Sequence, residues 1–295
     1  MSTAWLVTGA RGQLGHDLLD VLAARGERSV TAAGRADLDL TDEDGVRSRV
    51  RDWLSTAESR GDRAVLLNAA AYTAVDAAEN DEATARVVNG EAPGWLADEL
   101  AGRGRLVHVS TDYVFDGAAT EPYPVDAPPA PRSAYGRTKA AGERAVAAAG
   151  GDATVVRTAW VYGRHGANFV RTMLRLEAER ETVSVVDDQI GSPTWSADLA
   201  AGLVELGART TAFPPVLHYT NSGQVSWCGL ARAVFEEAGA DPARVLPVTS
   251  DAFPRPAPRP AYSVLDGGAW ISAGLTPART WRDALAEAMT SGFRN

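Results

Sequence analysis

The stretch that decides the fold is Trp5-Leu6-Val7-Thr8-Gly9-Ala10-Arg11-Gly12-Gln13-Leu14-Gly15. A short apolar run precedes three glycines spaced three apart, and leucines then recur at helical spacing up to Gly26. This order of strand, glycine turn and helix is typical of a dinucleotide-binding unit. Gly9 would allow the tight turn, Gly12 would let a pyrophosphate approach the backbone, and Gly15 would let helix and strand pack. The alternative is a glycine-rich loop with only a structural role.

Further strands and helices are predicted to alternate along the N-terminal half. Strands are expected at 29–33, 64–68, 105–110 and 154–157, and helices at 42–55, 84–101 and 133–149. Parallel strands about 30 residues apart with helices between them predict an α/β fold: a doubly wound parallel sheet (Rossmann) with a smaller C-terminal substrate-binding lobe.

The regular alternation of predicted strands and helices ends after residue 157. Tryptophans there lie in Gly- and Pro-containing loops, and 253–260 is too rich in proline for a regular helix. We expect residues 1–157 to form the dinucleotide-binding domain, rejoined by about 196–222. Residues 158–195 and 223–295 would form the substrate lobe, with a cleft above the carboxyl ends of the strands.

Composition excludes several classes of function. The chain has 295 residues and a net charge of −9, so it offers no basic face for nucleic acid or for an anionic membrane. Its single cysteine, Cys228, cannot close an intramolecular disulfide or form a zinc site, and no apolar run is long enough for a membrane span. We expect a cytoplasmic protein that binds no nucleic acid and no membrane. Its oligomeric state is not readable, and a homodimer is one possibility.

The end of the second predicted strand bears on the choice of cofactor. Arg35 stands where an acidic residue would hold a ribose 2′-hydroxyl, and an arginine there can meet a 2′-phosphate instead. NADPH is therefore favoured over NADH, although a solvated surface arginine is the alternative. Asp39 could accept a hydrogen bond from the adenine amino group. The small residues at Asn68-Ala69-Ala70-Ala71 would let a dinucleotide lie across the strand ends.

Tyr135 and Lys139 are the strongest candidates for catalysis. They lie four residues apart at the start of a predicted helix, so both project from one face. A phenol with a free pKa of about 10 becomes useful near neutral pH when a nearby cation stabilises its phenolate. Lys139 is the only lysine among 29 basic residues, which indicates that its chemistry is needed. A surface helix pair is the alternative reading.

A hydroxyl follows the fourth predicted strand. Thr111 would lie at the strand end, where it could bond a substrate oxygen that gains charge during hydride transfer. The alternative is an ordinary turn residue.

These motifs together resemble the extended short-chain dehydrogenase/reductases and, more closely, the dTDP-4-dehydrorhamnose reductase family. The likeness runs nearly from end to end. Its further segments are 110–115, 157–162, Asn168-Phe169, 188–194 and Arg259-Pro260 with Ser263.

The resemblance implies NADPH-dependent reduction of the 4-keto group of a dTDP-4-dehydro-6-deoxyhexose, with NADH possible. It implies a cofactor site around the glycine turn and the next strand ends: Gly9, Gly12, Gln13, Leu14, Gly15, Arg35, Asp39, Leu40, Ala69, Ala70, Ala71, Tyr72, Thr73, Tyr135 and Lys139. The sugar nucleotide would meet Thr111, Asp112, Tyr113, Tyr135, Trp160, Gln189 and Arg259. The tryptophan could equally be plain core. No metal is expected, because only Asp17 lies near the glycine turn.

In the expected mechanism, Tyr135 protonates the nascent alkoxide, Lys139 lowers the pKa of the tyrosine, and Thr111 bonds the same oxygen. Two alternatives stay open. A nucleotide-sugar epimerase or 4,6-dehydratase shares the fold, but Tyr113 occupies the position where a dehydratase carries its glutamate base. A non-catalytic regulatory subunit of the methionine adenosyltransferase type would not need the Tyr135/Lys139 pair.

Overall fold

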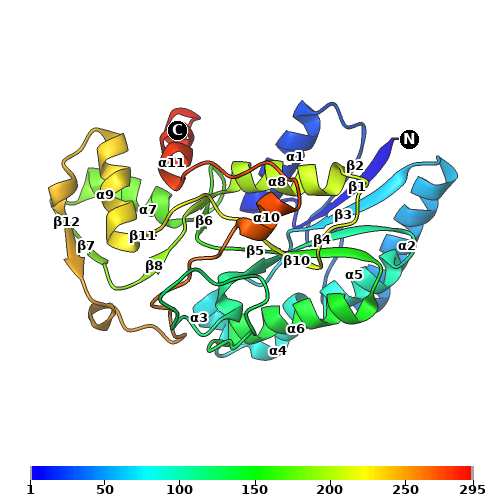
Figure 1. Ribbon diagram of the computed structural model, residues 1–295, viewed down its shortest axis with the longest axis horizontal. Coiled ribbons are helices and arrows are strands. Elements are labelled where there is room, and N and C mark those ends of the chain that lie inside the picture. The colour runs from blue at the N-terminus through cyan, green and yellow to red at the C-terminus, as the bar shows by residue number, and fades with distance from the viewer. Residues whose placement is uncertain (1, 294–295) are drawn as a thin grey trace.

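The computed structural model describes residues 2–293 and is built on a six-stranded parallel sheet (Figure 1). The strand order is β10-β5-β4-β3-β1-β2, and every neighbouring pair is parallel. The strands are β1 (Thr3–Thr8), β2 (Ser29–Ala33), β3 (Arg63–Asn68), β4 (Gly104–Thr111), β5 (Asp152–Thr158) and β10 (Val216–His218). This confirms the predicted doubly wound α/β class.

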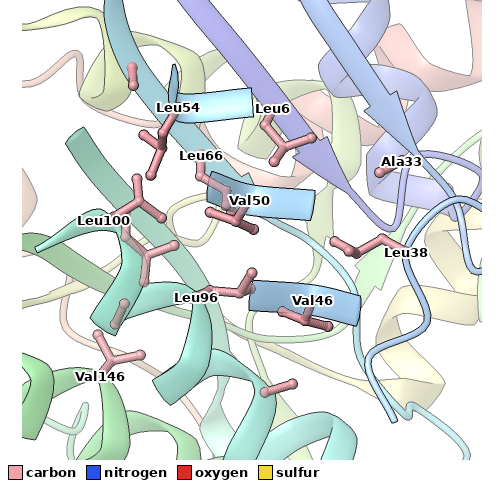
Figure 2. Close-up of a cluster of buried hydrophobic side chains, with 14 of the residues drawn as sticks. Leu6, Ala33, Leu38, Val46, Val50, Leu54, Leu66, Leu96, Leu100 and Val146 are labelled. Carbon is pink, nitrogen blue, oxygen red and sulfur yellow. The ribbon is translucent and has the colours of Figure 1, made fainter. Parts of the chain in front are cut away.

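Helices cover both faces of the sheet. One face carries α1 (Gln13–Ala24) and α8 (Ser196–Ala208), and the other carries α2 (Glu43–Ser59), α5 (Ala92–Leu100) and α6 (Ala134–Ala149) (Figure 1). Because both faces are covered, strand residues are buried almost without alternation, as in β1 and β3. Figure 2 shows one half of the core, in which Val46, Val50 and Leu54 of α2 point at Leu6 and Leu66 of the sheet.

The predicted helix at 84–101 is interrupted. The segment forms α4 (Glu82–Arg86), a π-helical turn η1 (Val87–Glu91) and then α5. Pro93 has no N–H to give to the carbonyl of Asn89, so the regular hydrogen-bond ladder fails at that point. The Asn89 carbonyl instead lies against Gly142 of α6, where any side chain would overlap it.

The C-terminal part beyond β5 packs a separate core around three short strand pairs. They are β6 (Val161–Tyr162) with β9 (Thr194–Trp195), β8 (Ile190–Gly191) with β11 (Val225–Ser226), and β7 (Val183–Val186) with β12 (Val245–Val248). The helices around this core are α7 (Phe169–Glu179), α9 (Trp227–Ala238) and α11 (Trp281–Thr290). α10 (Gly268–Ser272) instead places Trp270 in the core between the large sheet and α8. In Figure 1, α7, α9 and the β7/β12 pair lie at the end of the molecule opposite β2.

The remaining short elements are α3 (Val75–Ala78) after β3, η2 (Asp112–Val114) after β4, η3 (Pro242–Arg244) and η4 (Ser250–Ala252). Residues 253–260 form no helix, as their prolines predict. Within residues 2–293, no helix combines the length and the hydropathy needed to cross a membrane.

Candidate active site

The three glycines of the turn after β1 differ in what an added side chain would contact. Gly9 has φ +66°, and a Cβ there would lie 2.7 Å from the backbone nitrogen of Ala70. A Cβ on Gly15 would overlap the Gly9 carbonyl oxygen and lie 2.7 Å from the Cα of Ala10. A Cβ on Gly12 would meet only the Gly9 oxygen, at 3.2 Å. Gly9 and Gly15 therefore permit packing, whereas Gly12 has a single neighbouring atom on its Cβ side.

The N-terminus of α1 is shaped to receive an anion. Gly12 is its N-cap, with extended backbone and no side chain to cap the first turn. The helix dipole adds partial positive charge at this end. The uncapped N–H groups and the open side of Gly12 fit the pyrophosphate of a dinucleotide.

Two arginines flank the end of β2. Arg35 is exposed, as expected for a group that meets a phosphate. Arg11, which the sequence analysis did not single out, lies against Gly34, and its guanidinium is 3.8 Å from the Asp37 carboxylate. Its place inside the glycine turn was the available signal. Hydrogen bonds from Thr41, together with the charge of Arg35, hold the pKa of Asp39 below its usual value.

A residue that the sequence analysis missed holds the strand end after β3. Asn89, in the π-helical turn, accepts a hydrogen bond from the Tyr72 N–H (2.8 Å) and donates to the Tyr72 carbonyl (3.1 Å). It also donates to the hydroxyl of Thr138 on α6 (3.2 Å). The segment Ala69–Thr73 is thereby fixed between the glycine turn and α6. An isolated asparagine in a predicted helix gave no signal of this role.

Other expected cofactor residues have their side chains engaged within the protein. The Gln13 amide donates to the Val161 carbonyl (3.2 Å) and accepts from Asn168 (2.9 Å), so it joins the glycine turn to the C-terminal core. Leu40 is buried in the hydrophobic core and Leu14 packs against the cluster around α1. These residues could meet a dinucleotide through their backbone.

Tyr135 and Thr111 come together at the carboxyl end of β4. Ser133 caps α6 by accepting from the Gly136 N–H, which starts the helix just before Tyr135. Burial raises the pKa of Tyr135 to about 12, a hydrogen bond with Thr111 lowers it, and Asp112 raises it. The phenol is therefore protonated at neutral pH, which is the form that a proton donor needs.

Asp112 and Tyr113 complete this corner. Asp112 accepts a hydrogen bond from Thr111 (2.9 Å), and burial raises its pKa to about 6 although bonds from Thr111 and Ser263 lower it. The Tyr113 ring packs edge-on against Tyr135, with centroids 5.6 Å apart. Burial, followed by the charge of Asp112, raises the pKa of Tyr113. The aromatic side chain that packs on Tyr135 is thus a neutral phenol.

Lys139 is buried one helical turn after Tyr135. Its ammonium donates to the Val109 carbonyl (2.7 Å) and lies 3.4 Å from a ring nitrogen of His108. Burial lowers the pKa of Lys139 to about 8, against the opposing effect of the Glu143 carboxylate. The ammonium is thereby anchored to β4, while its Cα lies one helical turn along α6 from Tyr135.

Each of the three expected substrate residues of the C-terminal part has a partner within the protein. Trp160 adopts φ +49° and stacks on Trp227, with ring centroids 3.5 Å apart. Gln189 donates to the Ser250 hydroxyl (2.8 Å). Arg259 forms an ion pair with Asp76 (2.8 Å), so its charge is already neutralised.

A possible metal-binding group exists that the sequence analysis did not find. Ligand atoms of Asp17, Asp20 and His165 lie within 4.8 Å of one another. His165 comes from a loop after β6, too far along the chain to be paired with the acids from sequence alone. One oxygen of Asp17 already accepts a hydrogen bond from Ser196.

Comparisons with known proteins agree over nearly the full chain. Residues 3–293 match the family model described as RmlD substrate binding domain. The chain is 53% identical to a dTDP-4-dehydrorhamnose reductase of Streptomyces griseus, covering 96% of this chain and 92% of the relative. It is 51% identical to a probable dTDP-4,6-dihydroxy-2-methyloxan-3-one 4-ketoreductase of Streptomyces antibioticus, covering 96% and 94%. A crystal structure of dTDP-4-dehydrorhamnose reductase from Bacillus anthracis in complex with NADP superposes with a TM-score of 0.90 at 35% identity, covering 98% and 99%.

Proposed function

The chain belongs to the RmlD substrate binding domain family, and from this premise we propose its activity and the roles of its residues. It is a reductase that uses NADPH to reduce the 4-keto group of a dTDP-4-keto-6-deoxy sugar, dTDP-4-dehydrorhamnose, to give dTDP-L-rhamnose. The observation that carries the proposal is the corner at the end of β4. There a protonated Tyr135 meets the Thr111 hydroxyl, with Lys139 one turn further along the same helix.

The residues around the glycine turn hold the cofactor. The uncapped N-terminus of α1 and the open side of Gly12 receive the pyrophosphate, and Arg35 with Arg11 meets the 2′-phosphate. When bound, NADPH supplies the hydride that is delivered to C4 of the sugar.

Side chains of the protein transfer the proton and stabilise the charge that develops on the substrate oxygen. Tyr135 gives its proton to the oxygen on C4. Thr111 donates a hydrogen bond to the same oxygen once its hydroxyl turns from Asp112 to the substrate. Lys139 places positive charge beside the tyrosine and so stabilises the phenolate that forms. Tyr113, a neutral phenol next to Tyr135, cannot serve as the base that a dehydratase requires. Asp112, Trp160, Gln189 and Arg259 would contact the sugar nucleotide; for Arg259 this requires release from Asp76.

The proposal extends to organisation and location. Residues 1–157 with 196–222 would form the cofactor domain, because α8 packs beside α1 and β10 extends the sheet. Residues 158–195 and 223–295 would form the substrate lobe around a core of their own. A cytoplasmic location fits a chain whose single cysteine is buried and unpaired. A homodimer is the remaining part of the proposal, and sedimentation of the purified chain tests it.

The decisive experiment incubates the purified chain with dTDP-4-dehydrorhamnose and NADPH and follows cofactor oxidation and product. A reductase consumes one NADPH for each sugar reduced. An epimerase or a 4,6-dehydratase would return its cofactor unchanged, and a regulatory subunit would show no turnover. The matched substrate control is dTDP-4-keto-6-deoxyglucose. Absence of oxidation with both sugars would exclude the proposed activity.

A further inference from the structure

A buried chain of polar contacts leads from the glycine turn to Lys139. It starts at Thr8, the last residue of β1, and passes through Asn68 at the end of β3 to His108 in β4. The His108 ring then reaches the lysine. All four side chains are at most 1% exposed. Buried polar groups are expensive unless paired, so this arrangement needs an explanation beyond packing.

The orientation of the Asn68 amide is fixed by its neighbours. Its oxygen accepts hydrogen bonds from the Thr8 hydroxyl (2.7 Å) and from the Ala70 backbone N–H (3.3 Å). A backbone N–H can only donate, so the amide oxygen must face it and the NH₂ group must face His108. That NH₂ lies 2.9 Å from His108 Nδ1. The Nδ1 atom therefore accepts, and the neutral ring carries its proton on Nε2.

This tautomer decides which form of Lys139 is favoured. The Nε2–H of His108 faces Lys139 Nζ at 3.4 Å, while Nζ donates to the Val109 carbonyl (2.7 Å). An ammonium has three N–H donors and no acceptor, so it cannot form a hydrogen bond with the ring N–H, which is also a donor. A neutral amine has a lone pair that can accept this N–H. The ring contact thus favours the amine.

The other groups around the lysine do not reverse this preference. Glu143, on the same helix, favours the ammonium, but its carboxylate is already bonded by Arg157 of β5 (2.7 and 2.9 Å) and by the Ser110 hydroxyl (2.6 Å). Tyr135, also on α6, is neutral at pH 7. Burial, rather than any of these charges, is the main cause of the lowered pKa of Lys139.

We propose that His108, locked in its Nε2–H tautomer by Asn68, is a positioning residue that keeps Lys139 ready to release a proton near neutral pH. The inference rests on the proposed catalytic roles of Tyr135 and Lys139. When the Lys139 ammonium gives up a proton, one N–H bond breaks and solvent takes the proton. The amine that is left accepts the ring N–H of His108.

The single lysine makes a direct test possible. Protein labelled with ¹³C at the lysine ε-carbon gives one side-chain resonance, whose pH titration reports Lys139 alone. We expect a midpoint near pH 8 in the wild type. In parallel, ¹⁵N-histidine spectra identify which ring nitrogen of His108 is protonated, and His108→Gln assigns its signals. Protonation at Nδ1, or a lysine midpoint at the ordinary value of about 10.4, would overturn the proposal.

Asn68→Asp is the sharpest variant. A carboxylate at this position accepts from Nδ1–H, so the ring proton moves to Nδ1 and Nε2 becomes an acceptor for the ammonium. The lysine pKa should then rise by about one unit or more. Asn221→Asp is the matched control, since Asn221 is equally buried but is bonded to Trp195 and Asp198, and it should leave the lysine midpoint unchanged.

The lysine titration and the histidine spectra of Asn68→Asp together test the proposal. A rise with exchange of the ring proton supports the proposal, whereas no rise, or a rise without that exchange, contradicts it. If Asn68→Asp does not fold, the two wild-type measurements still stand. Neither readout depends on turnover, so a failure of the proposed reductase activity would be seen separately in the NADPH assay.

Discussion

Replacement by alanine should have different effects at the second and third glycines of the turn, Gly12 and Gly15. At Gly15 the added methyl group would overlap the Gly9 carbonyl oxygen. It would also fall about 0.7 Å short of an ordinary 3.4 Å contact with the Cα of Ala10. Such overpacking costs about 1 to 3 kcal/mol, and the better helix propensity of alanine returns up to about 1 kcal/mol. Because backbone atoms cannot yield easily, we expect a net loss of about 2 kcal/mol.

Gly12→Ala is the matched variant. Its methyl group would meet one atom at 3.2 Å, and φ −83° suits any residue. Because alanine is a poorer N-cap residue than glycine, stability should fall by about 1 kcal/mol or less. The methyl would occupy the space that the pyrophosphate needs, and NADPH affinity should fall about tenfold or more, equivalent to about 1.4 kcal/mol.

Thermal unfolding and NADPH titration by quenching of tryptophan fluorescence measure both effects. Gly15→Ala should melt about 3 °C below the wild type, and Gly12→Ala should lose no more than about half as much. If Gly12→Ala binds NADPH like the wild type, the cofactor does not lie over the N-terminus of α1. If Gly15→Ala melts unchanged, the packing argument is wrong.

Two further predictions concern buried charge. Asp112 has a pKa raised to about 6, so the folded state binds the extra proton and loses stability as pH rises from about 4 to 6. Asp112→Asn should remove this pH dependence, which amounts to about 3 kcal/mol at most. Urea unfolding at pH 4 and pH 7 measures it. If the wild type and the variant lose the same stability between the two pH values, the reasoning is wrong. Arg157→Met should lower the free energy of unfolding by about 3 to 5 kcal/mol, because it leaves the Glu143 carboxylate buried without its partner. The double variant Arg157→Met/Glu143→Leu should recover most of that loss in the same urea assay, and failure to recover would show that the arginine acts through packing.

The sheet could be predicted because its signals are local. Five of its six strands coincide with the short runs predicted from the sequence, and the glycines after β1 mark the start of the first helix. The third strand and the fifth strand fall within one or two residues of the expected bounds for the same reason. The π-helical turn was missed, because the loss of one hydrogen bond at Pro93 interrupts a helical pattern without erasing it.

The site residues likewise differ in whether local sequence identifies them. Spacing along a helix identifies Tyr135 and Lys139, and position after a predicted strand identifies Thr111. Asn89 and His108 do not, since each acts through a partner that is remote in sequence. The stacking of Trp160 on Trp227 likewise depends on how β6 and α9 pack, which no local pattern encodes.

The central claim is that Tyr135 gives the proton that completes reduction of the sugar. Single-turnover oxidation of bound NADPH by dTDP-4-dehydrorhamnose in Tyr135→Phe tests it most directly. The account predicts a rate lowered by about 10² to 10⁴-fold, with NADPH affinity retained. A rate equal to that of the wild type would assign the proton to another group.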